Sequence, residues 1–253
     1  MDTSKADVLK PFSLEGRTVL IVGASSGIGR ATAALTNARG AQVILMSRSR
    51  DKLEDVRSGL SSPDAATIAA ADYLNADELA RALDGVDVVD HAVIPAVADE
   101  NKKRGAFQNL PRDTMEASFD KFWGQINVLR AVTPKMPAGG SATLFSSIAG
   151  IKPSGKDSGL SVMNGVQAAI IQLGRSLAVE LGPIRVNVVA PGVVLTNVWT
   201  DDERASLKRW MEESLPVQRA GLPEHIAQAA LGLMTNPYIT GAVLTVDGGL
   251  HLT

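Results

Sequence analysis

The stretch Val22-Gly23-Ala24-Ser25-Ser26-Gly27-Ile28-Gly29 decides the fold, because it follows an apolar, strand-like run and opens a helical pattern. In a turn between a strand and a helix, Gly23 permits the tight bend, Gly27 lets the backbone approach a phosphate, and Gly29 lets helix and strand pack closely. The free N–H groups and positive dipole end of the helix then favour a pyrophosphate. The spacing differs from G-x-G-x-x-G, but its position at the first strand–helix junction predicts a dinucleotide site.

Apolar, β-rich runs alternate with longer helical patterns along the rest of the chain. Strands are expected at Thr18–Val22, Gln42–Met46, Thr67–Ala70, Val86–Val93, Ala142–Phe145, Arg185–Val189 and Val243–Val246. Helices are expected at Gly27–Arg39, Asp51–Leu60, Asp77–Leu83, Thr114–Met136, Leu160–Leu181 and Glu224–Met234. Strands separated by one helix each imply right-handed βαβ crossovers. The pattern predicts an α/β fold, a doubly wound Rossmann sheet of about seven parallel strands with helices on both faces.

The domain organisation expected from the 253 residues is a single Rossmann domain over residues 1–253, because α/β folds of this size are often undivided. Residues 1–12, which are polar and carry charges of both signs, are expected to be flexible. The stretch over residues 199–215 is expected to form a helical lid over the substrate, with Trp199 and Trp210 either lining a pocket or anchoring the lid.

Composition excludes several classes of function. A net charge of −2 and a pI near 5.9 give no basic field for nucleic acid or an anionic membrane. With no cysteine, the chain has no disulfide, thiolate nucleophile or cysteine metal site, and no spacing of His, Asp and Glu favours a metal. No secretory pattern follows the first residues, and no apolar run approaches the ~18 residues that span a bilayer. We therefore expect a cytoplasmic protein that acts on a small molecule.

The end of the second predicted strand bears on the choice of cofactor. A cofactor with a free ribose 2′-OH favours an acidic residue about 20 residues past the glycines. Ser47 and Arg48 stand at this place, and they suit the 2′-phosphate of NADP better than they suit NAD. The alternative interpretation is a solvated helix start.

Several ordered motifs resemble the short-chain dehydrogenase/reductase family over nearly the whole chain. Besides the glycine turn they are Asp72 after the third strand, Ser146-Ser147 after the fifth, Ile184-Arg185-Val186-Asn187, Pro191-Gly192, Thr196, Arg219 to Ile226, and Thr240 to Gly249. The resemblance implies an NADP(H) site made by Gly23, Ser25, Ser26, Gly27, Ile28, Gly29, Ser47, Arg48, Asp72, Tyr73, Pro191, Gly192 and Thr196. It also implies a homodimer or homotetramer.

The catalytic residues of the family are only partly present. The family uses a serine, a Tyr-x-x-x-Lys pair and a helix asparagine, with the tyrosine as general acid/base and the lysine lowering its pKa. Here Met163 stands at the tyrosine position and Gln167 at the lysine position. The chain's two tyrosines, Tyr73 and Tyr238, are not followed by lysine four residues later.

The resemblance places a lysine at the asparagine position, and of the four catalytic residues only the serine is kept. Lys121 takes the asparagine position, and the family's Asn-Asn-Ala-Gly segment is replaced by Ile94-Pro95-Ala96-Val97. Lys121 either faces the nicotinamide pocket, where it would polarise a carbonyl or donate a proton, or snorkels to the surface beside Trp123, which we favour. Ser147 either positions a substrate oxygen or satisfies backbone groups at the strand end.

Other polar residues have plainer interpretations. His91 is expected to be a satisfied core histidine and His251 a solvated tail residue, although His251 would also reach a neighbouring subunit's site. Lys152 and Lys156 lie near Ser147 and either meet an anionic substrate or are simply solvated. The run Asp201-Asp202-Glu203 is expected to complement a helix dipole.

Three functions remain open. The first is an NADP(H)-dependent oxidoreductase that acts on a carbonyl or alcohol with altered acid/base groups. The second is a cofactor-binding protein without turnover, acting as a sensor or partner subunit, and the missing Tyr/Lys pair favours it. The third is a non-redox enzyme, such as a lyase or cyclase, that reuses the cleft with Ser147 or Lys121. We favour the first, because both the adenine and the nicotinamide sides of the site are retained.

Overall fold

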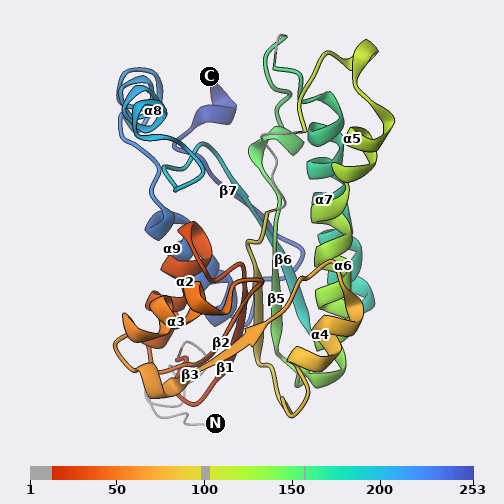
Figure 1. The fold of residues 1–253 in the computed structure, drawn as a ribbon, viewed down its shortest axis with the longest axis vertical. Coiled ribbons are helices and arrows are strands. Elements are labelled where there is room, and N and C mark those ends of the chain that lie inside the picture. The colour runs from red at the N-terminus through yellow and green to blue at the C-terminus, as the bar shows by residue number, and fades with distance from the viewer. Residues whose placement is uncertain (1–12, 98–102, 157) are drawn as a thin grey trace.

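The computed structural model describes residues 13–97, 103–156 and 158–253. The expected flexibility of residues 1–12 therefore lies outside the described residues. Within them, the elements follow one another along the chain as the alternating sequence pattern predicts (Figure 1).

The centre of the fold is a seven-stranded sheet in the order β3-β2-β1-β4-β5-β6-β7, in which every neighbouring pair is parallel. Its strands are β1 (Thr18–Val22), β2 (Gln42–Ser47), β3 (Ala66–Ala70), β4 (His91–Ile94), β5 (Ser141–Phe145), β6 (Arg185–Pro191) and β7 (Val243–Val246). The chain reverses direction across the sheet between β1 and β4, which is the switch point where such sheets bind ligands. The predicted doubly wound α/β fold is confirmed.

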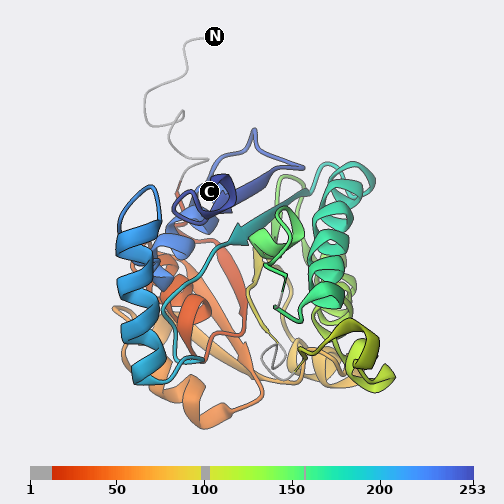
Figure 2. The same cartoon turned by 90° about the horizontal axis from the view of Figure 1, so that it is seen from above.

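Helices cover both faces of the sheet (Figure 1). One face carries α2 (Gly27–Asn37), α3 (Arg50–Ser58) and α9 (Pro223–Thr235), and the other carries α4 (Ala76–Ala82), α6 (Asp120–Val132) and α7 (Ser161–Glu180). Each set encloses its own aliphatic core against the strands. Seen from above, α5 (Arg112–Ala117) and α8 (Asp201–Ser214) stand on opposite sides of the molecule (Figure 2). No helix in the described part of the chain is long and apolar enough to cross a membrane.

Two predicted elements were wrong in their extent. Strand β4 begins at His91 rather than Val86, because the amides of Val89 and Asp90 bond to Lys135 and Thr18 before the ladder with β1 begins. The helix expected over Thr114–Met136 is broken between α5 and α6 and ends at Val132. At the break, the ammonium group of Lys103 binds the carbonyl oxygen of Ala117, which a continuous helix would offer to its own backbone.

Helix α7, which buries Val166, Ile170 and Ile171 against the sheet, also makes two very close contacts that depend on glycines. A Cβ on Gly174 would lie 2.3 Å from Cγ2 of Val188 in β6. A Cβ on Gly150 would lie 2.7 Å from the backbone of Gln167 and Ala168. The helix therefore packs with its backbone close to β6 and to the turn that follows Ser147.

Candidate active site

The glycine turn forms a tight cradle between β1 and α2. Gly23 has a φ of +89° and Gly27 a φ of +50°, conformations that disfavour any side chain. A Cβ on Gly29 would lie 2.1 Å from the carbonyl oxygen of Gly23. Ser26, at the N-cap of α2, does not use its side chain to cap the helix. The first N–H groups of α2, including that of Ile28, are thus left for an anion.

The predicted nicotinamide side lies directly opposite this cradle. A Cβ on Gly27 would meet Cγ2 of Thr196 at 3.3 Å, so the segment after β6 packs against the turn. Pro191 ends β6, and Gly192 continues the ladder by donating to the carbonyl of Val246 at 3.1 Å. The structure therefore brings the two predicted halves of the dinucleotide site together at the carboxyl edge of the sheet.

The adenine side is built from the ends of β2 and β3. Arg48 is exposed and forms no ion pair with any described residue. The buried hydroxyl of Ser47 has no hydrogen-bond partner among the described residues. Asp72 accepts a bond from the amide of Leu74 at 3.0 Å, and Tyr73 is buried. The glycine turn, where an added Cβ would crowd its neighbours, and the unpartnered hydroxyl of Ser47 together fit a dinucleotide.

Lys121 lies inside the protein, and the snorkelling interpretation was wrong. Its side chain is 4% exposed. The ammonium nitrogen donates to Gln167 Oε1 at 3.2 Å and to the carbonyl oxygen of Ser146 at 3.3 Å. Helix α6, the end of β5 and helix α7 therefore meet at this amine.

Gln125 holds Lys121 in place and was missed by the sequence interpretation. Its amide nitrogen donates to the carbonyl of Phe145 at 3.1 Å, and its Oε1 accepts from the amide of Phe145 at 2.9 Å. These two bonds fix α6 to the end of β5 one turn after Lys121. The signal was a polar residue four positions after Lys121 on the buried face of the helix.

Two further positions that the sequence predicts to be catalytic hold Ser147 and Met163. Ser147 Oγ accepts from the amide of Ala149 at 3.2 Å, so it caps the short helix η6 (Ile148–Gly150), as the plainer interpretation held. Its hydroxyl proton is still available to a substrate oxygen. Met163 is buried, and a thioether has no proton to give.

His251 is ordered by a carboxylate instead of lying free in solvent, which corrects the tail interpretation. Its Nδ1 lies 2.7 Å from Asp247 Oδ2, and its amide donates to the same oxygen at 2.8 Å. Burial alone would raise the pKa of Asp247, but hydrogen bonds from His251 and Gly249 outweigh burial and hold this pKa below its ordinary value. The sequence signal was the spacing of four residues between the two side chains.

The remaining residues singled out in the sequence lie in the core, at the start of α8 or on the surface. His91 is buried and lies 2.8 Å from Ser141 Oγ through Nδ1, and burial lowers its pKa to about 4. The acidic run beginning at Asp201 opens α8, behind a capping box of Thr200 and Glu203. Lys156 is exposed. No group of metal-ligating side chains occurs among the residues that the structure describes.

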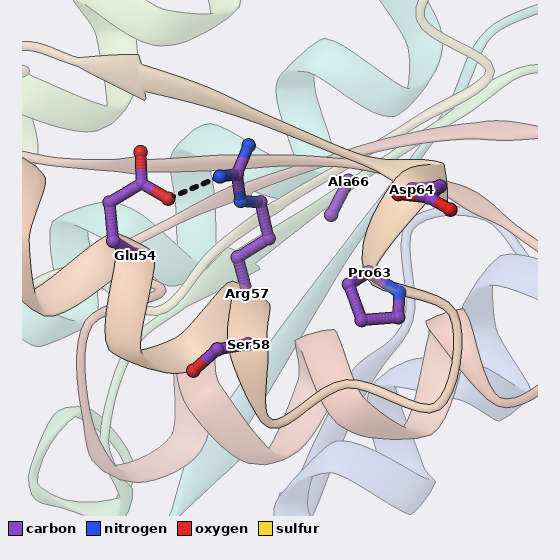
Figure 3. A pocket seen from close by; sticks show the side chains of 6 residues that line it. All are labelled: Glu54, Arg57, Ser58, Pro63, Asp64 and Ala66. Carbon is purple, nitrogen blue, oxygen red and sulfur yellow. Dashed lines mark ion pairs between the residues drawn. The ribbon is translucent and has the colours of Figure 1, made fainter.

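Two surface hollows lie away from these residues. One is between the end of α3 and the start of β3, at the amino edge of the sheet, and is lined by Glu54, Arg57, Ser58, Pro63, Asp64 and Ala66 (Figure 3). The other is lined by Arg112, Met115, Glu116 and Phe119, all on or beside α5. Neither contains a predicted site residue, so neither is the candidate active site.

The fold and the glycine cradle define a nucleotide-binding α/β protein, and comparison with known proteins gives its family. The family model described as enoyl-(acyl carrier protein) reductase matches residues 23–251. A putative ketoacyl reductase of the granaticin polyketide synthase from Streptomyces violaceoruber is 33% identical, over 94% of this chain and 97% of the relative. The 3-oxoacyl-[acyl-carrier-protein] reductase of Bos taurus is 32% identical, over 92% of this chain and 97% of the relative.

A solved structure supports the same family. A short-chain type dehydrogenase/reductase from Mycobacterium ulcerans superimposes with a TM-score of 0.84 at 30% identity, over 95% of this chain and 91% of the other. The chain belongs to the short-chain dehydrogenase/reductase family, whose members are oxidoreductases that use nicotinamide cofactors.

Proposed function

We propose that the protein is an NADP(H)-dependent oxidoreductase that acts on a carbonyl or alcohol through a non-standard active site. The observation that carries the proposal is the complete cradle of Gly23, Gly27 and Gly29, with Thr196 packed against it. These glycines adopt conformations or make contacts that other residues would strain. Such a turn between a strand and a helix leaves room for a pyrophosphate at the helix N-terminus, which supports a dinucleotide as the ligand.

The preference for NADP(H) over NAD(H) is supported by the residues after β2. Arg48 is exposed and unpaired among the described residues, and its guanidinium has the geometry for a phosphate. Serine and arginine, and not an acidic residue, stand at positions 47 and 48, and the orphaned hydroxyl of Ser47 is an additional polar group there.

The chemistry proposed for the site follows from three side chains. When bound, the reduced nicotinamide supplies a hydride. Ser147 donates a hydrogen bond to the substrate oxygen and so positions it, and Lys121 brings an amine to this end of the sheet. Gln167 links Lys121 to α7 and offers its amide to a ribose hydroxyl. Two relatives are named as reductases of ketoacyl or 3-oxoacyl groups, which supports a ketone as the substrate class.

The proposal also covers the domain organisation, the lid, the oligomeric state and the location of the protein. The 253 residues act as one domain, α8 serves as a lid over the substrate, and the protein works as a homodimer or homotetramer in the cytoplasm. Helices α6 and α7 would supply the interface. If light scattering showed a monodisperse monomer, the prediction of an oligomer would be refuted.

One observation favours a second candidate function. Met163 is buried where the family places its proton donor, and it has no proton to give. A protein that binds NADP(H) without turnover, as a sensor or partner subunit, would tolerate this residue.

The test is a titration with NADPH and with NADH, followed by nicotinamide fluorescence. We expect micromolar binding of NADPH and much weaker binding of NADH. Arg48→Ala should weaken NADPH by about 10-fold or more, which corresponds to about 1.4 kcal/mol, and leave NADH unchanged. Arg39→Ala, an exposed arginine just beyond the far end of α2, is the matched control. Binding of neither nucleotide would refute the proposal, and binding without reduction of any carbonyl would select the second candidate.

A further inference from the structure

The C-terminal turn joins three parts of the candidate active site. It comprises Asp247 at the end of β7 and the short helix η7 (Leu250–Leu252). Figure 1 shows the C terminus at the same edge of the sheet as α8 and the loops after β5 and β6. The turn therefore lies at the edge of the sheet where the proposed substrate would bind.

Asp247 lies directly against the predicted nicotinamide segment. A Cβ on Gly192 would be 2.7 Å from Cβ of Asp247, so the two backbones touch. The Asp247 side chain is only 4% exposed, and its two oxygens accept bonds from the amides of Gly249 and His251. Its carboxylate is consequently fixed in direction.

The turn is also attached to the serine loop and to the segment after α8. Lys152 follows η6, and its ammonium nitrogen donates to the carbonyl of Leu250 at 3.2 Å. A Cβ on Gly249 would lie 2.7 Å from Cγ of Pro216, so the segment after α8 also packs against the turn. These contacts fix the two residues that directly precede His251.

His251 differs from the other two histidines of the chain. His91 is bonded to a serine in the core, and His225 accepts from the amide of Leu222 at the start of α9. Within the part of the chain that the structure describes, only His251 is paired with a carboxylate, through Nδ1, and its Nε2 has no hydrogen-bond partner there. A carboxylate on one ring nitrogen fixes the tautomer and leaves the other for proton transfer.

We infer that the Asp247–His251 pair supplies the proton of the reaction, in place of the tyrosine that is missing at Met163. The inference rests on the proposed function. As the carbonyl carbon accepts the hydride, the carbonyl oxygen takes the proton from Nε2 of the imidazolium, and an alcohol and a neutral ring result. The ring is 27% exposed, so solvent can return the proton. In the alcohol-oxidising direction the neutral ring accepts the proton.

The first test is nuclear magnetic resonance of protein labelled with ¹⁵N-histidine and ¹⁵N-glycine, titrated with NADP⁺. With three histidines in the chain, the ring signals can be assigned by single substitutions. We expect NADP⁺ to shift the signals of Gly23, Gly27 and His251, but not those of His91 and His225. A shift of the glycines without His251 would overturn the inference and leave the proposed function standing. If neither the glycine signals nor the His251 signal shifted, both the inference and the proposed function would be refuted.

The second test is the rate of NADPH-dependent reduction of ethyl acetoacetate. His251→Ala should lower kcat by about 10²-fold or more, leave the KM for NADPH unchanged, and recover part of the rate when free imidazole is added. Asp247→Asn should lower kcat less, and His225→Ala should have no effect. An unchanged kcat in His251→Ala, or a loss that imidazole does not restore, would overturn the role. If the wild-type protein does not reduce ethyl acetoacetate, the inference is tested by the NADP⁺ titration alone.

Discussion

The ammonium nitrogen of Lys121 lies 3.2 Å from Oε1 of Gln167, and this contact joins α6 to α7 at two positions that the sequence predicts to be catalytic. The amine of the pair is carried by α6, whereas the family resemblance predicts a lysine on α7, at Gln167. Both residues are buried, so a second cation here would be poorly screened.

This contact predicts a double-mutant cycle. Gln167→Lys alone should destabilise the protein, because it would place two ammonium groups within contact distance. Lys121→Asn combined with Gln167→Lys should recover most of the loss. We expect a coupling of about 1–3 kcal/mol in urea unfolding of the four proteins. Additive effects would show that the two side chains do not interact.

Gly23→Ala should reduce both stability and NADPH binding. The residue has a φ of +89°, and a new Cβ would lie 2.9 Å from Cα of Ala96. Gly85→Ala is the matched control, because Gly85 has a φ of +75° with nothing within 4 Å of a new Cβ. The control should show only the backbone strain, about 1–2 kcal/mol, and bind NADPH normally. Equal effects in thermal unfolding would contradict the role of crowding at Gly23.

Arg185→Leu should cost about 2–4 kcal/mol in urea unfolding. The buried guanidinium donates to the carbonyls of Leu233, Met234 and Ile239, at 2.7, 2.6 and 3.0 Å, and so closes the C-terminal end of α9. Arg130→Leu, an exposed arginine in the last turn of α6, should change stability by less than about 0.5 kcal/mol. A loss below about 1 kcal/mol for Arg185→Leu would mean that water replaces these bonds without cost.

His91 should make the protein less stable below neutral pH. Burial lowers its pKa to about 4 from 6.5, so between these values the unfolded chain binds a proton that the folded protein does not. Stability therefore falls as pH drops through 6.5 and stops falling near pH 4. From pH 7 to pH 5 the expected contribution is about 2 kcal/mol. His91→Gln should remove this part of the pH dependence, and an unchanged slope would contradict the burial effect.

The strands and the cofactor cradle were predictable because their signals are local. Alternating apolar runs located all seven strands, and the glycines of the turn are required by their own backbone angles and near neighbours. The limits of β4 and the break before α6 were not predictable, since they depend on Asp90 and Lys103 bonding to residues elsewhere in the fold.

The environment of the catalytic positions was harder to predict for the same reason. Whether Lys121 reaches solvent depends on how α6 is rotated about its axis. That rotation is fixed by Gln125 bonding to Phe145 and by Gly124 packing against Tyr73, where a Cβ would lie 2.1 Å from the ring. Both contacts join segments that are far apart in the sequence. The position of the His251 ring likewise depends on the carboxylate of Asp247, whose orientation is fixed only when the C-terminal turn has folded.

The close packing of α7 through Gly150 and Gly174 separates the attachment of this helix from its chemistry. Since these close contacts and the apolar face formed by Val166, Ile170 and Ile171 carry the docking, the positions of Met163 and Gln167 can exchange residues while the helix stays where it is. Natural selection can therefore rewrite the reactive groups of such a protein one substitution at a time without first rebuilding its frame. The same property makes the chain a suitable starting point for installing new reactive groups by design.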